Sequence, residues 1–501
     1  MKIKRILIAN RGEIAIRIMK TARLMKIETV AVKTSVEPNA MYLSFADKIY
    51  DNSEESSDIP VFLDIDKIIT IALKTKADAI HPGYGFLAEN AYFADKCIDN
   101  NIIFIGPSPD SIYKMGNKTI ARRIAMANKI PMAMGSEGNV SNEYEAVKIA
   151  EKIGYPVIIK AASGGGGRGM RIVRKSEDME KMFIIASKEA EKAFNDHSVF
   201  IEKYIENPKH IEFQILGDKK GNVIHLGERE CSIQRKHQKL VEEAPSCALD
   251  ESLRNKMGKM AVQITKAVNY YSAGTVEFLL DSEKKFYFME MNTRIQVEHP
   301  VTEIITGIDI VEQQIRVANG EELKFTQKDI KLKGWAIECR INAEDVQAGF
   351  APDPGKIEKL NMPDDDYVRI DTGIQVGSSI VSSYDSMIAK LIVKGKDRKE
   401  ALLNCKKALD KVWIKGTKTT LPFFRMLVRH PKFQSGNFTT AFIEKDLDKF
   451  YINSEYEEML AAWLATKLFI EENLNDDSIN IDFRQSKEIS PWLLNKRISQ
   501  F

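Results

Sequence analysis

Residues 158–170 read Ile-Ile-Lys-Ala-Ala-Ser-Gly-Gly-Gly-Gly-Arg-Gly-Met. The apolar run before Lys160 predicts a short buried strand that brings this lysine to its end. The four glycines lack Cβ atoms, so their backbone N–H groups can approach an anion closely. The spacing differs from the GxxxxGK[ST] phosphate loop, and no GxGxxG followed by a helix occurs here. The stretch therefore predicts either an ordinary loop or a cradle for a polyphosphate.

The composition is that of a globular protein. The length of 501 residues predicts about three domains, and 44% hydrophobic residues supply a sizeable core. The net charge is only +2, and no stretch combines Lys and Arg with aromatics, so we do not expect a nucleic-acid partner. The five cysteines form no CxxC pair, which indicates reduced thiols in a cytoplasmic protein. No run reaches the ~18 apolar residues of a membrane span.

The first hundred residues alternate short apolar strands with helical periodicity, which predicts a parallel α/β sheet. Ligands bind such sheets at the carboxyl ends of the strands. Asn10, Arg11, His81 and Tyr84 follow predicted strands and belong to that edge. The alternative is that they are turn residues and helix caps, which we favour for Asn10 and Gly12.

A small αβ subdomain is predicted for residues 132–203. Small, flexible residues at Pro131–Gly138 indicate a hinge, and the glycine run lies inside the segment. A glycine-rich flap on hinges is typical of a lid. The chain then returns through residues 202–205, where an extended backbone could meet a purine edge.

Antiparallel strands are predicted next. His210–Leu216 alternates with period two, and Val223–Glu228 pairs with it across a glycine-containing turn. The polar and basic stretch Cys231–Lys239 indicates either a solvated loop or an anion site that needs partners from elsewhere.

Two acids stand alone in apolar strands. Glu277 lies in Gly274–Leu280 and Glu290 in Phe286–Met291, with a tight turn between the strands. Both strands can therefore point a carboxylate at one spot, and buried carboxylates need compensating charge. A hard cation such as Mg²⁺, bridging phosphates, would supply it. The alternative is an acid paired with Lys or Arg at a surface.

A polar segment follows the second of these strands. Asn292 continues the metal edge, and Arg294, Gln296 and Glu298 come next. An arginine can hold a planar oxyanion by two parallel hydrogen bonds, and a neighbouring glutamate can act as a base. Taken alone, Arg294 and Glu298 could equally form a structural ion pair.

The last third predicts an α+β domain. A strand in Gly334–Asp345 carries Arg340, further strands include Met387–Val393, and a helix begins near Lys399. An amphipathic helix is predicted after residue 447, with Leu460, Trp463, Leu464 and Leu468 on one side. The tail has no assigned function, and packing against the body or another protomer is the default.

Seven stretches, in this order, resemble the biotin carboxylases of the ATP-grasp superfamily. They are ANRGEIAIRI at 9–18, HPGYGFLAEN at 81–90, MGNK at 115–118, KAASGGGGRGM at 160–170, CSIQRKHQKLVEEAP at 231–245, EMNTRIQVEHPVTE at 290–303 and ECRINAED at 338–345. The resemblance covers residues 1 to about 447. Within the family it is greatest to the stand-alone biotin carboxylase subunit of two-subunit pyruvate carboxylases, as in methanogenic archaea.

The resemblance implies a multidomain α/β and α+β fold. We expect an N-terminal parallel α/β domain (1–114), an ATP-grasp domain (115–320) with a mobile glycine-rich lid at about 132–203, a C-terminal antiparallel α+β domain (331–447) and an extension (448–501).

The resemblance also implies site residues, position by position. For ATP they are Lys118, Lys160, Gly165, Gly166, Gly167, Glu202, Lys203, Ile205, His210, Gln234, His237 and Leu279. For Mg²⁺ or Mn²⁺, at two expected sites, they are Glu277, Glu290 and Asn292. For bicarbonate they are Lys239, Arg294, Gln296 and Val297. Glu298 matches the base, Arg340 the cation that steadies the biotin enolate, and Tyr84 lies near the biotin.

The implied reaction forms carboxyphosphate from bicarbonate and ATP and then carboxylates biotin. No Ala-Met-Lys-Met attachment tetrapeptide occurs, and Met132-Ala133-Met134-Gly135 lacks the lysine, so biotin should come on a separate protein, a biotinylated carrier or carboxyltransferase subunit. The family suggests a homodimer core. Acetyl-CoA or propionyl-CoA carboxylation, another ATP-grasp acyl-phosphate ligase and a non-catalytic nucleotide sensor remain alternatives.

Two departures from the family pattern bear on the carrier. Ala88 stands where many relatives have Ser, and residues 382–385 read Ser-Ser-Tyr-Asp where two prolines and a tyrosine pair are frequent. That loop is expected near the point where the carrier approaches, so carrier specificity is left open.

Overall fold

The computed structural model describes residues 2–54, 59–162, 170–194, 196–381, 383–446 and 462–467. The chain forms two units, residues 1–448 and residues 449–501. In the second unit, residues 462–467 are helical, with Trp463 and Leu464 exposed. The rest of the predicted amphipathic helix lies outside the described residues.

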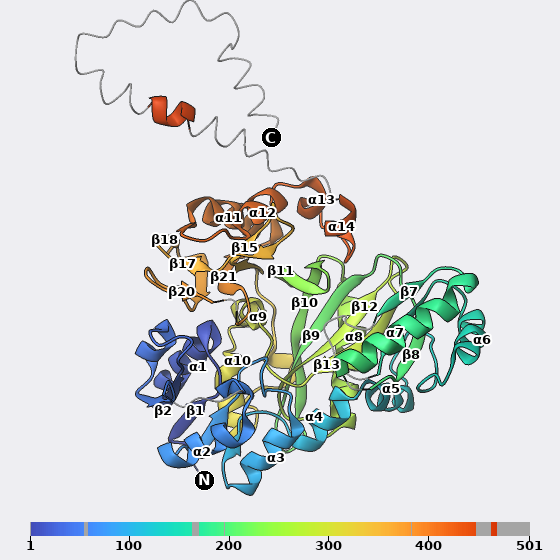
Figure 1. Cartoon of the computed structure of the whole chain (residues 1–501), viewed down its shortest axis with the longest axis horizontal. Helices are drawn as coiled ribbons and strands as arrows, with labels where there is room; N and C mark the ends of the chain where they lie inside the picture. Colours follow the sequence, from blue (N-terminus) through green and yellow to red (C-terminus); the bar gives the residue numbers. More distant parts are fainter. Residues whose placement is uncertain are drawn as a thin grey trace, which may run out of the picture. The chain divides into compact units, whose positions relative to one another are not determined.

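The N-terminal part is a five-stranded parallel sheet in the order β3-β2-β1-β4-β5 (Figure 1). Its strands and helices are β1 Arg5–Ile8, α1 Gly12–Leu24, β2 Glu28–Lys33, β3 Lys48–Asp51, α2 Ile65–Thr75, β4 Ala79–His81, α3 Ala91–Asp99, β5 Ile103–Phe104 and α4 Pro109–Gly116. Side chains alternate along β1, so Ile6 and Ile8 enter one core cluster and Leu7 another. Both faces of the sheet are therefore covered, as parallel strands require, and the predicted α/β arrangement is confirmed.

The candidate cap Asn10 has a structural role. Its Nδ2 donates to the carbonyl oxygens of Pro82 (2.8 Å) and Tyr84 (2.7 Å), which fixes the loop after β4 beside the end of β1. Gly12 begins α1 with φ +64°, a conformation that favours glycine. The favoured interpretation of both residues as turn positions is confirmed.

A small layer carries the predicted lid. It follows α5 Lys118–Ala127 and consists of α6 Glu143–Ile153, β6 Val157–Ala161, β7 Arg171–Val173, α7 Met179–Phe194 and β8 Val199–Lys203, with the antiparallel sheet order β7-β6-β8. It has its own core, which includes Val157, Ile159 and Phe183. Residues 163–169 lie outside the described residues, and so do the predicted phosphate contacts Gly165, Gly166 and Gly167. Mobility of the lid stays a prediction.

The centre of the molecule is one antiparallel sheet of eight strands in the order β13-β12-β9-β10-β11-β14-β21-β19 (Figure 1). The strands are β9 Lys209–Gly217, β10 Val223–Arg235, β11 Gln238–Ala244, β12 Ser272–Leu280, β13 Phe286–Asn292, β14 Trp335–Asn342, β19 Val368–Thr372 and β21 Met387–Gly395. The strands predicted for the last third of the chain thus continue the sheet of the middle third. Residues far apart in sequence meet on this sheet.

The solvated-loop interpretation of Cys231–Lys239 is wrong. Cys231–Arg235 end β10, Lys236 and His237 form a turn with positive φ, and β11 begins at Gln238. Ser232 is buried, and its hydroxyl accepts from His210 N (2.8 Å) and donates to Glu230. Polar residues enter this strand because partners on neighbouring strands satisfy them.

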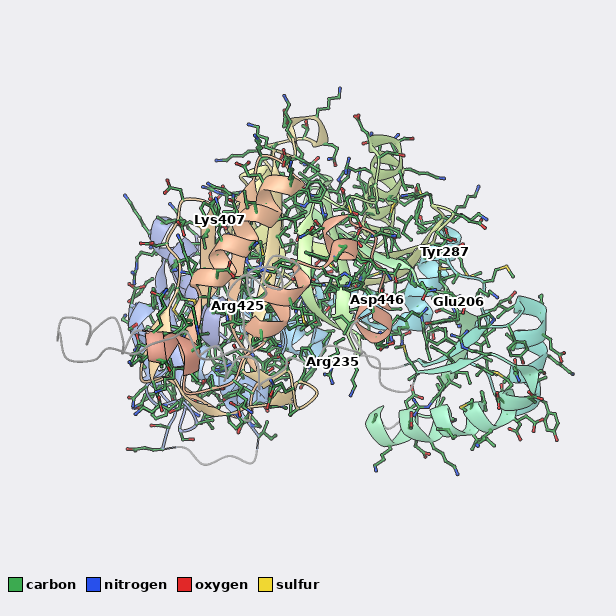
Figure 2. The ribbon with its side chains drawn as sticks, turned by 90° about the horizontal axis from the view of Figure 1, so that it is seen from above. Glu206, Arg235, Tyr287, Lys407, Arg425 and Asp446 are labelled. Carbon is green, nitrogen blue, oxygen red and sulfur yellow. The ribbon has the colours of Figure 1, made fainter. Side chains whose placement is uncertain are left out.

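The other elements are distributed over the N-terminal part, the lid layer and the central sheet. They are α8 Glu251–Ala267, α9 His299–Thr306, α10 Ile310–Ala318, α11 Arg398–Lys411, α12 Leu421–Leu427, α13 Pro431–Gln434, α14 Phe442–Asp446, the short strands β15 Glu344–Asp345, β16 Ala351–Pro352, β17 Gly355–Lys356, β18 Lys359–Asn361, β20 Ser379–Ile380 and β22 Trp413–Lys415, and the 3₁₀ turns η1 Met41–Phe45, η2 Val61–Leu63, η3 Ser176–Asp178 and η4 Gln327–Asp329. Thr440 N donates to Pro208 O (2.9 Å) and Lys445 of α14 donates to Asn207 Oδ1 (2.5 Å), so α14 lies beside the loop that follows β8; Figure 2 labels Asp446 and Glu206 on these two segments. Among the described residues, no helix combines the length and apolar character needed to cross a membrane.

Candidate active site

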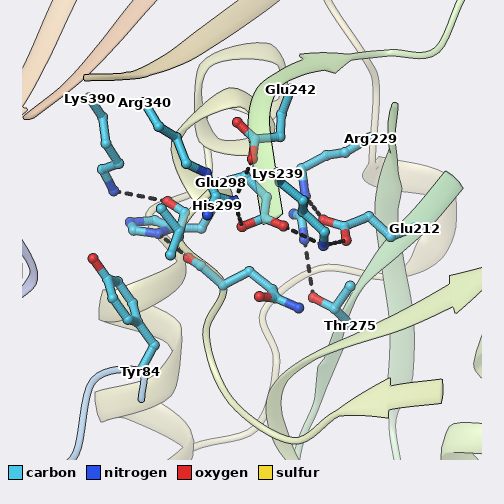
Figure 3. Close-up of polar contacts among 12 residues, drawn as sticks. Tyr84, Glu212, Arg229, Lys239, Glu242, Thr275, Glu298, His299, Arg340 and Lys390 are labelled. Carbon is cyan, nitrogen blue, oxygen red and sulfur yellow. Dashed lines mark hydrogen bonds and ion pairs between the residues drawn. The ribbon is translucent and has the colours of Figure 1, made fainter. Parts of the chain in front are cut away.

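Lys239 of β11 lies at the centre of a buried charge cluster (Figure 3). Its Nζ donates to Glu212 Oε2 (2.5 Å), Glu277 Oε1 (2.9 Å) and Glu298 Oε1 (2.7 Å). Burial opposes its charge, but the three carboxylates raise the pKa of Lys239 well above its usual value. The lysine is therefore a fixed positive charge.

Glu212 is held in place by a second cation that the sequence analysis did not identify. Arg229 of β10 is fully buried, and its Nε lies 2.5 Å from Glu212 Oε1. Its other nitrogens donate to Gln214 Oε1 (2.7 Å) and Thr275 Oγ1 (3.1 Å). The period-two alternation of His210–Leu216 places Glu212 and Gln214 on one face, which is the signal that could have found them.

Glu298 is the predicted base. It has no exposed surface, and its second oxygen lies 2.9 Å from Arg340 Nη2. Burial alone would raise the pKa of Glu298, but Lys239, Arg340 and Arg229 hold it well below its usual value. The carboxylate is therefore ionised throughout the neutral range.

Arg294 does not form the ion pair with Glu298 that the sequence left open. Its Nε lies 2.8 Å from Glu89 Oε2, and its Nη1 donates to Gln296 Oε1 (2.8 Å). Glu89 belongs to the motif at 81–90 but was not selected from the sequence, because its partner is 205 positions away. Arg294 is thus held at the rim of the cluster by the N-terminal domain.

Direct strand pairing brings together the two carboxylates that are predicted to bind metal. Glu277 and Glu290 are cross-strand partners on β12 and β13, as the sequence predicted. Asn292 Nδ2 donates to Glu277 Oε1 (2.8 Å), and His210 Nε2 lies 2.9 Å from Glu277 Oε2. Burial and the neighbouring Glu277 raise the pKa of Glu290.

This donor set fits a hard cation. Glu277 is buried and Glu290 half-buried, and two neighbouring carboxylates that repel each other gain from a divalent ion between them. A second group of possible ligand atoms, from His210, Glu212 and Glu277, gathers within 4.8 Å, and Glu290 is not part of it. Metal binding by these groups, at two sites, stays a prediction.

The predicted phosphate lysines lie on α5 and β6. Lys160 Nζ donates to Glu202 Oε2 (2.5 Å), and Glu202 also pairs with Arg122. Burial, together with Lys118 and Arg122, lowers the pKa of Lys160 to about 7. Lys118 is the first residue of α5, where the helix N-terminus itself favours anions.

The other predicted nucleotide contacts lie on or just after the lid strand β8, on the central strands β9, β10 and β12, and on the turn after β10. Lys203 Nζ donates to the carbonyl oxygens of Gly154 (2.9 Å) and Tyr155 (3.0 Å), and Ile205 is half-buried after β8. Leu279 pairs across from His210, and the buried Gln234 pairs across from Lys239. His237 is exposed on the turn between β10 and β11. Their contacts with nucleotide stay predictions.

A polar network connects Tyr84, which is predicted to lie near the biotin, with Val297, which is predicted to bind bicarbonate. Tyr84 Oη donates to Glu13 Oε1, and Lys390 Nζ lies 3.1 Å from the same oxygen. Lys390 also donates to Val297 O (2.9 Å). Lys390 and Glu13 were missed, although Lys390 is a single charge in an apolar strand, the same signal that identified Glu277.

The loop that departs from the family pattern lies against the N-terminal domain. Ser382 is outside the described residues, whereas the Tyr384 ring has the Arg11 guanidinium 4.3 Å from its centroid. Arg11 is itself paired with Glu37. Ala88, the other departure, is buried.

Comparison with known proteins identifies the family. Residues 2–112 match the biotin carboxylase N-terminal domain, residues 117–326 the ATP-binding domain of the carbamoyl-phosphate synthase L chain, and residues 338–445 the biotin carboxylase C-terminal domain. A biotin carboxylase of Nostoc sp. is 52% identical over 445 residues, 89% of this chain and 99% of that protein.

Two further relatives extend the comparison. A subunit of the pyruvate carboxylase of Methanothermobacter thermautotrophicus is 48% identical over 469 residues, 93% of this chain and 95% of that protein. The biotin carboxylase domain dimer of Hydrogenobacter thermophilus 2-oxoglutarate carboxylase, solved with MgADP, ADP and bicarbonate, is 47% identical with TM-score 0.85, covering 89% of this chain and 98% of that one. These matches confirm the predicted fold class. The chain therefore belongs to the biotin carboxylase family and is, as its sequence predicted, an ATP-dependent ligase.

Proposed function

We propose that this biotin carboxylase performs the first half-reaction of a two-subunit pyruvate carboxylase, with biotin carried on a separate protein. The support is the match to the pyruvate carboxylase subunit of Methanothermobacter, which spans 95% of that relative and 93% of this chain. The products of the half-reaction are carboxybiotin, ADP and phosphate. The biotinylated partner then passes the carboxyl group to its acceptor.

The observation that carries the assignment of the site is the position of Glu298 between Lys239 and Arg340. We assign Lys239, Arg294, Gln296 and Val297 to bicarbonate and Glu298 to its proton. Bicarbonate is a poor nucleophile until it loses that proton, and an ionised buried carboxylate is placed to take it. The resulting oxygen attacks the γ-phosphate of ATP and forms carboxyphosphate.

We assign the nucleotide to α5, to the lid and to the central strands that carry its predicted contacts. Lys118, Lys160 and the glycine loop would meet the phosphates, and residues 202–205 the base. Glu277, Glu290 and Asn292 would hold Mg²⁺ or Mn²⁺, which supplies positive charge to the transferring phosphoryl group. The lid would exclude water, because carboxyphosphate decomposes in it.

Biotin is assigned to Arg340 and Tyr84. Arg340 is half-buried, and the carboxylates of Glu242 and Glu298 raise its pKa against the opposing effect of desolvation. A permanent cation is suited to stabilising the enolate oxygen of biotin while the ring nitrogen captures CO₂.

The oligomeric assembly of this protein is inferred from two relatives. The Hydrogenobacter domain is a dimer, which supports a homodimer core for this chain. The Methanothermobacter relative is named as one subunit of its enzyme, which supports a second, biotinylated partner chain here. All five cysteines are free, which supports a cytoplasmic location.

A 2-oxoglutarate carboxylase is the second candidate. The Hydrogenobacter domain, 47% identical to this chain, belongs to such an enzyme. Pyruvate and 2-oxoglutarate are both 2-oxo acids, and the acceptor meets the partner chain, so this site serves either reaction equally well.

Reconstitution with the co-purifying biotinylated protein tests the acceptor. With ATP, Mg²⁺ and ¹⁴C-bicarbonate, we expect acid-stable label with pyruvate and none with 2-oxoglutarate, acetyl-CoA or propionyl-CoA. Label only with 2-oxoglutarate supports the second candidate instead. Label only with an acyl-CoA overturns both.

Free biotin tests the site itself. Because Lys239 and Arg294 are assigned to bicarbonate, we expect Lys239→Gln and Arg294→Ala to slow bicarbonate-dependent ADP formation about 100-fold or more. Lys259→Gln, on the exposed face of α8, is the control and should match the unmodified enzyme. Unchanged turnover in Lys239→Gln or Arg294→Ala contradicts the assignment.

A further inference from the structure

Arg340 has a second carboxylate partner that the proposed reaction does not use. Glu242 of β11 has no exposed surface and pairs with Arg340 Nη2, the same nitrogen that lies 2.9 Å from Glu298 Oε2 (Figure 3). One guanidinium nitrogen is thus shared by two buried carboxylates. Burying a carboxylate is costly, so this arrangement calls for an explanation.

Glu338 lies directly opposite Glu242 on the neighbouring strand β14. It is fully buried, and within the described part of the chain neither of its carboxylate oxygens has a hydrogen-bond partner. Burial, helped by Glu242, raises the pKa of Glu338 well above its usual value. The charged form of Glu338 is therefore disfavoured, and Glu242, which has the guanidinium of Arg340 beside it, is the member of the pair with a direct counter-charge.

The two partners of Arg340 behave differently during the proposed reaction. When Glu298 takes the proton of bicarbonate, bicarbonate and ATP become carboxyphosphate and ADP, and Glu298 becomes a neutral carboxylic acid. Arg340 then loses one counter-charge just before it must meet biotin. A largely enclosed guanidinium without an anion is unfavourable and would be displaced toward another partner.

Building on the proposed function, we infer that Glu242 is a positioning residue: it holds Arg340 at the biotin pocket while Glu298 carries the bicarbonate proton. Its place on β11, within a sheet paired on both sides, gives the rigidity that such a role needs. Lys239, Glu298 and Arg340 define the proposed reaction centre. Glu242 lies outside that set and holds Arg340 through their ion pair.

The charged surroundings predict how this support depends on pH. Arg340 and Glu338 on β14, Lys239 on β11 and Glu298 before α9 all act on Glu242, and Lys390 on β21 acts on Glu338. Burial raises the pKa of Glu242 to about 7, against the opposing effect of Arg340, and Glu298 adds to the rise. Glu242 therefore becomes charged as the pH rises through about 7, and its charged form is the one that holds Arg340 by an ion pair.

The experiment compares two rates in one protein. Without biotin, carboxyphosphate decomposes in water, and the ADP that forms with bicarbonate alone gives the biotin-independent rate. The increase in ADP formation when free biotin is added gives the biotin-dependent rate. For Glu242→Gln we expect the biotin-dependent rate to fall about 10- to 100-fold, because Arg340 is misplaced, and the biotin-independent rate to change less than about threefold. The ratio of the two rates should rise through about pH 7 in the unmodified enzyme and be flat in Glu242→Gln.

Glu243→Gln is the matched control. Glu243 is the next residue of β11, faces the other side of the sheet, and accepts from Arg398 (2.7 Å) and Trp335 (2.8 Å). The Glu243→Gln variant removes a comparable buried ion pair, the one with Arg398, and leaves the ion pairs of Arg340 intact. We therefore expect both rates to stay unchanged. If Glu243→Gln loses the biotin-dependent rate as Glu242→Gln does, or if Glu242→Gln loses both rates together with its thermal midpoint, the role is structural and the inference fails.

Arg340→Ala separates this inference from the proposed function. If Arg340→Ala keeps the biotin-dependent rate, the proposed role of Arg340 is wrong. If Arg340→Ala loses that rate while Glu242→Gln keeps it with an unchanged pH profile, the positioning role alone is wrong.

Discussion

At the scale of the residue, the charge state of Lys160 links nucleotide binding to pH. Burial and the cations Lys118 and Arg122 lower the pKa of Lys160 to about 7, while Glu202 accepts its hydrogen bond. A polyphosphate favours the protonated lysine and so raises its pKa. Above pH 7 the free enzyme therefore holds mostly neutral Lys160, and binding must bring in a proton.

We accordingly expect proton uptake approaching one per ADP bound at pH 8, and little uptake at pH 6. Affinity should weaken by up to about tenfold per pH unit above 7, until the pKa of the bound state is reached. Calorimetric titration in two buffers of different ionisation enthalpy measures the uptake. Lys160→Met is the reference, since it removes the titrating group and should show none. Equal uptake in the two proteins would assign the proton to another group.

At the scale of the element, local patterns predicted the strands well and their partners poorly. Alternation and the tight turn at Asp281–Lys285 were enough to pair Glu277 with Glu290, because a hairpin fixes its own register. The partner of Arg294, Glu89, and that of Glu242, Arg340, come from other parts of the chain. No local pattern sets the order in which distant strands join a sheet, so these contacts required the structure.

Lys390 shows how one strand supports a loop on another element. It is fully buried on β21, lies 3.1 Å from Glu13 Oε1 of α1 and donates to Val297 O in the segment before α9. Burial opposes its charge, but Glu13, Glu338 and Asp371 raise its pKa. Helix α1, the central sheet and the segment before α9 are thus tied together at one ammonium group.

Removing that ammonium group should destabilise the protein. For Lys390→Met we expect a loss of about 3 to 5 kcal/mol, because Glu13 is left buried without its cation. Lys394→Met, on the exposed end of the same strand, should cost less than about 0.5 kcal/mol. Urea denaturation followed by tryptophan fluorescence measures both. Similar losses in the two variants would show that the strand, and not the ion network, is sensitive.

At the scale of the whole molecule, the eight-stranded sheet makes the middle and last thirds of the chain interdependent. β14 pairs with β11 and with β21. Arg340 of β14 pairs with Glu242 of β11 and with Glu298, and Lys390 of β21 acts on Glu338 of β14. A chain ending at residue 330 would expose the edge of β11 and leave Glu242 without its cation. Unpaired edges and unpaired buried charges both favour aggregation or unfolding.

Two truncations test this interdependence. Residues 1–448 form one unit and contain every residue of the site, so we expect this fragment to melt within about 3 °C of the full chain and to carboxylate free biotin at a similar rate. Residues 1–330 should be insoluble or lack a cooperative thermal transition, because β14, β21 and β19 are gone from the sheet. A soluble 1–330 fragment with a cooperative transition would mean that the ATP-grasp part folds alone, and that the C-terminal strands add only the cations that balance Glu242 and Glu298.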